Sequence, residues 1–236
     1  MPLYDITLFN WLALAVFIVV WISYTWFADH SRWSKKSLPS IMNFHRHRWM
    51  REVLKRDLRV PDATIMGNFV QSAVFFASTA ILIVGGLVTT LGASDKAQHA
   101  MTALPFGSPA SPTLWQLKIV SLILVFIYAF VKFIWAVRLA NYSSMLFSAA
   151  PYYAGKINED YAVELGKMIG LFGLHFNQGL RANFFALALL GWWIGPHFFV
   201  LSTCMVLWVL YRREFRSKSL AAVIRLKQIA EDETNI

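Results

Sequence analysis

The sequence has little charge, few acidic residues and almost no cysteine. Only 15% of its 236 residues are charged, and 22 lysines and arginines outnumber 13 acidic residues. The single cysteine, Cys204, excludes a disulfide within the chain, and we interpret it as an inert packing residue of an apolar segment. With 57% apolar residues and a mean hydropathy of +0.50, the composition is unusual for a soluble domain.

Signatures of common enzymes are missing as well. The sequence has no glycine-rich phosphate loop after a strand and no nucleophile with a paired base. The histidines give no convincing ligand set, since His45 and His47, two residues apart, would point to nearly opposite sides of a helix. We therefore expect no cofactor, no metal and no catalytic residue, and we do not expect an enzyme.

What the sequence has in abundance is long apolar runs. A helix needs about 20 residues to cross the roughly 30 Å hydrocarbon core of a bilayer. Three runs qualify, and we predict spanning helices over residues 7–28, 68–92 and 115–137. A fourth apolar region is too long for one ordinary span and is interrupted by Gly195 and Pro196. It forms either one kinked helix or a hairpin of two spans, over residues 178–194 and 197–211.

Positive charge decides between these alternatives. Segment 29–67 carries nine basic residues, whereas the connection between the second and third runs carries only Lys96. By the positive-inside rule, the first segment is cytoplasmic and the second is not. The amino terminus has no basic residue before the first span and lies outside, whereas the basic tail, a helix over residues 212–236, lies inside. We therefore predict an all-α bundle of five spans, forming one membrane domain over residues 1–236.

The cytoplasmic segment 29–67 contains an amphipathic helix. Its apolar face collects Met42, Trp49, Met50, Val53 and Leu54. Its basic stripe consists of Arg48, Arg51, Lys55 and Arg59. Such a helix lies in the membrane interface and attracts anionic lipid. Membrane topology also accounts for the basic balance of the chain, and because no groove-reading motif is visible, we expect no nucleic-acid partner.

Four polar residues at the inner ends of two spans form the candidate binding site. Asn177 and Arg181 share one face of the fourth span, while Arg138 and Asn141 lie at the inner end of the third. A guanidinium there would bind a lipid phosphate or cap the carbonyls of another helix. The functional interpretation is an anion or headgroup site, and the structural one is a polar lock between helices.

Two lysines lie within the third span. Lys118 and Lys132 are close enough to its ends for their ammonium groups to reach the lipid headgroups. Lys132 is also a candidate for a polar lock or, in an oligomer, for a ring that lines a pore and favours anions.

Two classes of function fit these features. The first is a structural, accessory or lipid-binding protein that self-associates, because small residues on the second span allow helices to approach closely; these are Ala73, Ala77, Ser78, Gly85 and Gly86. The alternative is a transporter or channel for small solutes or anions, formed by an oligomer. We expect membrane lipids, anionic ones above all, as partners, together with further copies of the chain or another membrane protein.

Several stretches also resemble a known family. They are residues 62–91, Arg138 and Asn141 followed by Pro151, the stretch NQGLRANFF over residues 177–185, and Gly195 with Pro196. Over nearly the whole chain, the sequence resembles the membrane-protein family listed under domain of unknown function 599. The resemblance implies a polytopic protein of the bacterial cytoplasmic (inner) membrane. It supplies no active-site residues.

Overall fold

The computed structural model describes residues 6–92, 111–150 and 158–232, and within these ranges it contains helices and their connections but no strand. The all-α prediction is confirmed. The α-helices are α1 (Leu8–His30), α2 (Leu38–Lys55), α3 (Val60–Gly92), α5 (Pro112–Ala149), α6 (Glu159–Leu190), α7 (Pro196–Phe215) and α8 (Lys218–Asp232). Two short 3₁₀ helices, η2 (Ser34–Lys36) and η3 (Gly191–Trp193), precede α2 and α7.

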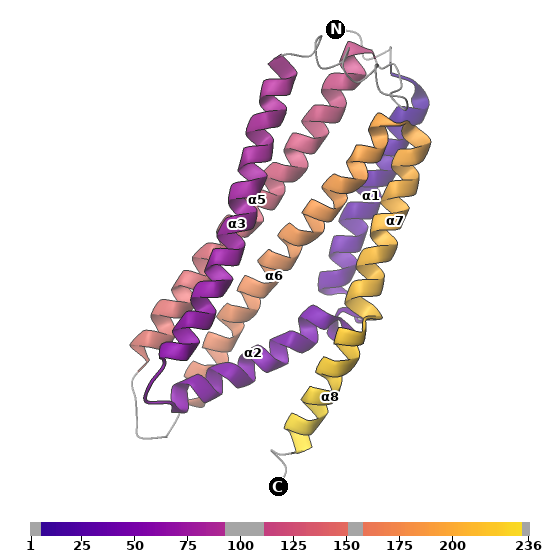
Figure 1. Cartoon of the computed structure of the whole chain (residues 1–236). Coiled ribbons are helices and arrows are strands. Elements are labelled where there is room, and N and C mark those ends of the chain that lie inside the picture. The colour runs from indigo at the N-terminus through magenta and orange to yellow at the C-terminus, as the bar shows by residue number, and fades with distance from the viewer. Residues whose placement is uncertain (1–5, 93–110, 151–157, 233–236) are drawn as a thin grey trace.

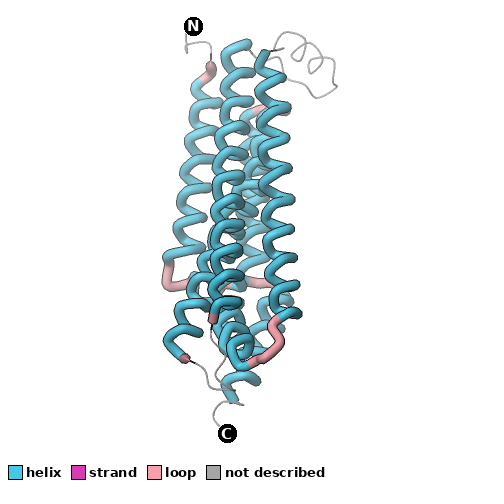
Figure 2. The backbone as a smooth tube through the Cα atoms, turned by 90° about the vertical axis from the view of Figure 1, so that its left-hand side faces the viewer, coloured by secondary structure: helices cyan, strands magenta, loops and turns pink. Residues whose placement is uncertain are grey.

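Five of these helices run lengthwise beside one another. Figure 1 shows α1, α3, α5, α6 and α7 passing alternately down and up the molecule, with the start of α1 and the end of α8 at opposite ends of the bundle. Helix α2 crosses the lower end, and α8 continues below α7. The side view in Figure 2 shows the same long bundle, with its connections gathered at the two ends.

Local sequence signals fix several helix starts. Before α2, the Ser37 hydroxyl accepts a hydrogen bond from the Ser40 amide, and before α5, the Ser111 hydroxyl accepts one from the Leu114 amide. Asn158 caps α6 in the same way, and α7 begins at Pro196, where the missing amide hydrogen costs nothing.

Three helices are long and apolar enough to cross a membrane: α1 with 23 residues, α3 with 33 and α5 with 38. They contain the three clean spans predicted from the sequence. At about 1.5 Å per residue, α3 and α5 are roughly 50 and 57 Å long, well beyond the roughly 30 Å of a hydrocarbon core. The lower ends of these two helices therefore project beyond any membrane that the bundle crosses.

The fourth apolar region forms two antiparallel helices. Helix η3 and Gly195 separate α6 from α7, which turns back alongside it, so the alternative of one kinked helix is wrong. The Ser202 hydroxyl of α7 donates to the Ala188 carbonyl of α6 and joins the two. Helix α6 differs from the prediction because it starts at Glu159 rather than near residue 178 and ends at Leu190. Five membrane crossings remain a prediction.

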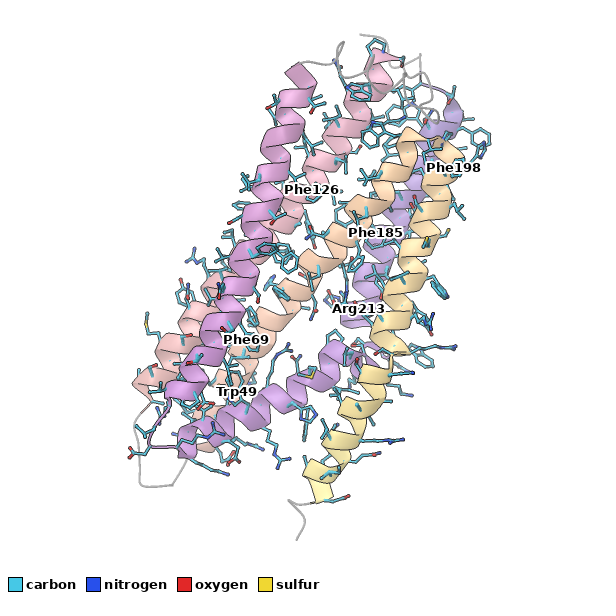
Figure 3. The ribbon with its side chains drawn as sticks, in the orientation of Figure 1. Trp49, Phe69, Phe126, Phe185, Phe198 and Arg213 are labelled. Atoms are coloured by element: carbon cyan, nitrogen blue, oxygen red, sulfur yellow. The ribbon has the colours of Figure 1, made fainter. Side chains whose placement is uncertain are left out.

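The bundle has two hydrophobic cores. The upper core lies between α1, α5, α6 and α7 and includes Phe17, Phe133, Phe185 and Phe199. The lower core lies between α2, α3, α5 and α6 and includes Met50, Met66, Phe147 and Ile169. Figure 3 shows Phe185 in the upper part of the bundle and Trp49 with Phe69 in the lower part.

The lower core changes the interpretation of the amphipathic helix. Met50, Val53 and Leu54 are buried in this core, so this part of the apolar face of α2 packs on the protein rather than on lipid. The basic stripe also needs correction, because α2 ends at Lys55 and Arg59 lies beyond it. Arg59 donates to the carbonyls of Phe147 and Ala150, at the end of α5.

The helix predicted for the tail is two helices, because Arg216 and Ser217 separate α7 from α8. Residues 233–236 lie outside the described ranges.

Candidate functional site

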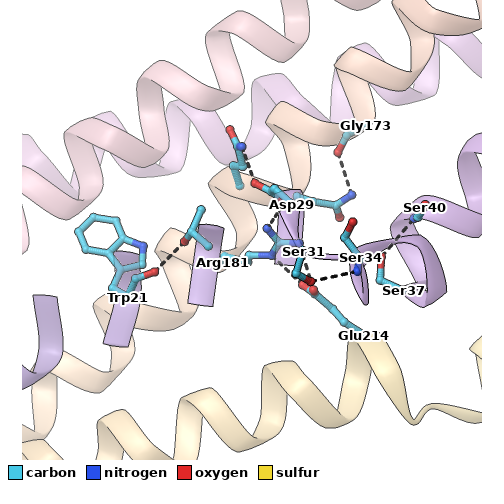
Figure 4. A network of polar contacts seen from close by, with 12 residues as sticks. Trp21, Asp29, Ser31, Ser34, Ser37, Ser40, Gly173, Arg181 and Glu214 are labelled. Atoms are coloured by element: carbon cyan, nitrogen blue, oxygen red, sulfur yellow. Dashed lines mark hydrogen bonds and ion pairs between the residues drawn. The ribbon is translucent and has the colours of Figure 1, made fainter. Parts of the chain in front are cut away.

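Arg181 holds three helices together through two carboxylates. Its guanidinium donates two hydrogen bonds to Glu214 of α7, from Nε at 2.8 Å and from Nη2 at 3.0 Å. Nη1 donates to Asp29 of α1 at 2.6 Å, and the Gln178 amide donates to the other Asp29 oxygen at 2.7 Å. Figure 4 shows this ion triad of Asp29, Arg181 and Glu214. The side chains are only 3–10% exposed.

The structure divides the four predicted site residues into two groups. Asn177 and Arg181 lie together, one turn apart on α6, and both line cavities next to α2. Arg138 is exposed on α5, where it donates to the Tyr142 hydroxyl and stacks on its ring. Asn141 is exposed as well, and neither α5 residue lines these cavities. The predicted cluster of four is therefore wrong, because Arg138 finds its partner within its own helix.

The ion triad also changes the interpretation of Arg181. All three nitrogens of its guanidinium donate to carboxylates, so its charge is compensated inside the protein. This geometry matches the predicted polar lock between helices. An incoming phosphate would have to compete with two carboxylates that are already in place.

A strip of glycines on α6 lets α2 approach closely. Gly166, Gly170 and Gly173 lie three and four residues apart, and they face His47, Asn43 and Arg46 of α2. At Gly173 an added Cβ would lie 2.6 Å from the Arg46 Cζ, closer than carbon atoms can pack. The glycine at this position therefore makes room for the Arg46 guanidinium against the surface of α6.

Arg46 is a cation without a carboxylate partner. Its Nη1 donates to Asn43 Oδ1 at 2.6 Å, and within the described ranges it forms no ion pair. Burial lowers the pKa of the Arg46 guanidinium below its ordinary value, because the charged form loses hydration. A buried cation in this state gains from any anion that can reach it.

Two open cavities meet at Arg46. The first, which we call the serine cavity, has a volume of about 100 Å³ and a mainly polar lining that includes Ser34, Ser37, Ser40 and Asn43. The second, the apolar cavity, has about 150 Å³ and is lined between α2, α6 and α7 by Leu38, Met42, Leu180, Phe184 and Leu210. Pro39, Arg46, Asn177 and Arg181 line both. The two cavities are therefore neighbours on either side of these shared residues.

Arg213 adds a second cation at the apolar cavity. It extends from α7 toward α6, with its guanidinium 5.6 Å from the centre of the Phe184 ring, and it is labelled in Figure 3. The residues that line the two cavities include three arginines, Arg46, Arg181 and Arg213, and two acids, Asp29 and Glu214. One net positive charge is left, which favours an anion.

The remaining predicted basic residues have local partners. Arg51 pairs with Glu159 of α6 and Lys55 with Glu52, and these side chains are about half exposed. Arg48 is half-buried on α2. Lys132 lies 5.3 Å above the Tyr128 ring, one turn earlier on α5. Exposed ion pairs such as those of Arg51 and Lys55 add little stability.

Two further sequence interpretations need correction. Lys118, expected to extend toward the headgroups, is buried within the protein: the residue is only 2% exposed, and its ammonium lies 5.9 Å from the rings of Trp192 and Trp193. Cys204 was expected to be a packing residue, but it is exposed on α7.

Sequence reasoning missed Asp29, Arg46, Arg213 and Glu214. One signal for the acids was present, because Asp29 and Glu214 each lie in the last turn of an apolar helix, where a carboxylate needs a partner. The glycine spacing over residues 166–173 also indicated a close helix contact. Nothing in the sequence indicated that Arg46, among nine basic residues in its segment, is the one facing this contact.

Comparison with known proteins places the chain in a family. A model of the family described as protein of unknown function, DUF599, matches residues 12–219 and confirms the resemblance predicted from the sequence. No curated protein and no solved structure matches the chain.

Proposed function

The chain belongs to the DUF599 family, and we propose that it is an integral membrane protein of structural or accessory type that binds an anionic phospholipid where the serine and apolar cavities meet. The phosphate contacts Arg46 and Arg213. The acyl chains follow the apolar cavity along α6 and α7.

The observation that carries this proposal is the half-buried Arg46 guanidinium, held at the junction of the two cavities without a carboxylate. Arginine hydrogen bonds to phosphate are charge-assisted and can be bidentate, which makes them stronger than bonds between neutral groups. The phosphate supplies the missing negative charge, and Asn177 beside it adds a polar contact. An apolar wall next to a cation suits a lipid better than a free phosphate ion.

The proposed orientation puts this site at the headgroup level of the cytoplasmic leaflet. Helices α1 and α7 end beside the cavities, and basic residues follow both ends: Arg32, Lys35, Lys36, Arg216 and Lys218. With five crossings, the amino terminus lies outside and the carboxyl terminus inside. The same proposal places the protein in a bacterial cytoplasmic membrane. It also includes a protein partner, above all a second copy of the chain.

A transporter or channel formed by an oligomer remains the alternative. Transport sites are commonly built from discontinuous helices at mid-membrane depth. In the described ranges, α3, α5 and α6 are continuous over 33, 38 and 32 residues. The lipid-binding proposal therefore has the more specific support.

Native mass spectrometry of the protein with dioleoyl phosphatidylglycerol tests the proposal. The substitution R46Q removes the unpaired charge, and we expect lipid affinity to fall about 10-fold to 100-fold, as is typical for a lost charge-assisted hydrogen bond. The matched control R225Q removes one exposed positive charge on α8 and should leave affinity within about twofold.

Two results would contradict the proposal. Equal loss of lipid in R46Q and R225Q would mean that only net charge matters. Equally tight binding of inorganic phosphate, measured by isothermal titration, would mean that the apolar cavity contributes nothing and that the ligand is a soluble anion.

A further inference from the structure

The serine cavity contains more polar groups than a phosphate alone requires. Its opening is surrounded by Ser34, Ser37 and Ser40, with Asn43 and Asn177 beside them. The Ser37 hydroxyl accepts from the Ser40 amide, whereas the hydroxyls of Ser34 and Ser40 form no hydrogen bond with the described residues. These hydroxyls can both donate and accept, as can the hydroxyls of a polyol.

The charges around this cavity disfavour an ammonium headgroup. Each Asp29 oxygen already accepts a hydrogen bond, one from Arg181 and one from Gln178. Both Glu214 oxygens accept from Arg181. An ammonium group would therefore find no uncommitted carboxylate, and it would lie next to the Arg46 cation, where like charges repel.

The size of the cavity limits the headgroup further. A cavity needs roughly 10–15 Å³ of such volume to hold one water molecule, and the serine cavity has about 100 Å³, so it admits a small polyol. Arg46, the proposed phosphate contact, lines both cavities, whereas the three serines line only the serine cavity and Leu180 and Leu210 line only the apolar cavity. This is the arrangement of a phosphodiester with fatty acyl chains on one side and a hydroxylated group on the other.

We propose that the serine cavity selects phospholipids whose headgroup is an uncharged three-carbon polyol, as in phosphatidylglycerol. This headgroup selection rests on the lipid site proposed above. Phosphatidic acid fills the phosphate position but leaves the serine cavity empty. Phosphatidylethanolamine places an ammonium there.

The test compares these three lipids with identical acyl chains on the delipidated full-length protein, by native mass spectrometry. We expect the wild type to bind phosphatidylglycerol about fivefold to tenfold more tightly than phosphatidic acid, as one or two hydrogen bonds would give, and phosphatidylethanolamine most weakly. The substitution S40V, which removes a hydroxyl and adds a methyl group, should bring phosphatidylglycerol down to the level of phosphatidic acid and leave the latter unchanged.

The control is S72V, at an exposed serine of α3 whose hydroxyl bonds only to its own helix. It should keep the wild-type preference. Equal affinity of the wild type for phosphatidylglycerol and phosphatidic acid, with both lost in R46Q, would overturn the headgroup selection but leave the lipid site standing. Failure of the wild type to bind either anionic lipid would overturn both, and neither comparison depends on whether S40V folds.

Discussion

The substitution R181Q will lower the free energy of unfolding by about 3–5 kcal/mol, the usual effect of breaking a buried ion pair from one side. The reason is the geometry of the ion triad. Without the guanidinium, the carboxylates of Asp29 and Glu214 remain close together, buried, and without a cation. Heating of purified protein in detergent, followed by the remaining monodisperse fraction on size exclusion, measures the loss.

Neutralising the carboxylates provides the control. The triple variant D29N, R181Q, E214Q contains no charge at this position, and its amides can bond to one another. We expect it to recover most of the stability lost in R181Q, because an uncompensated buried charge is more harmful than an absent ion pair. Wild-type stability of R181Q, or a triple variant as unstable as R181Q, would contradict the structural role given to Arg181.

A reporter fused at the carboxyl terminus will distinguish the two sides of the membrane in an all-or-none way. Green fluorescent protein should fluoresce there and alkaline phosphatase should be inactive, because the proposed five crossings put this end in the cytoplasm. Alkaline phosphatase fused after Gly92, at the end of α3, should be active in the same cells. The physical basis is the concentration of lysine and arginine after α1 and near the end of α7, at one end of the bundle.

The comparison of the two fusion positions, after Gly92 and at the carboxyl terminus, makes this result decisive. Alkaline phosphatase activity at both positions would mean an even number of crossings between the amino and carboxyl termini. In that case α6 and α7 would not both cross, and the lipid site would not lie in the cytoplasmic leaflet. Inactivity at both positions would place the end of α3 inside and would contradict the assignment of its direction.

The lengths of the apolar runs predicted the helical architecture well, for a clear physical reason. The three clean spans coincide with most of α1 and with the apolar parts of α3 and α5, since hydrocarbon length imposes a run of about 20 residues. Pro196 marked the start of α7 because proline lacks the donor that a continuing helix needs. The start of α6 was misplaced because its first half is polar on one side and packs in the lower core.

The site was harder to predict, because it depends on contacts between distant segments. Arg181 was found as a costly charge, but its partners lie 152 residues before it and 33 after it. Arg138 and Arg181 are both arginines near the inner ends of helices, and only the helix rotation shows that one is exposed and the other buried. Arg46 emerged from the closeness of α2 to Gly173, a distance that composition does not encode.

Photo-crosslinking is the most direct test of the proposed anionic-lipid site between α2, α6 and α7. Phosphatidylglycerol with a diazirine near the start of one acyl chain is incorporated with the protein into vesicles, illuminated, and mapped by peptide mass spectrometry. We predict adducts on the walls of the apolar cavity, at Leu180, Phe184 and Leu210, which disappear in R46Q. Adducts spread equally over the exposed face of α3, at Phe75 and Leu82, and unchanged in R46Q, would contradict a specific lipid site.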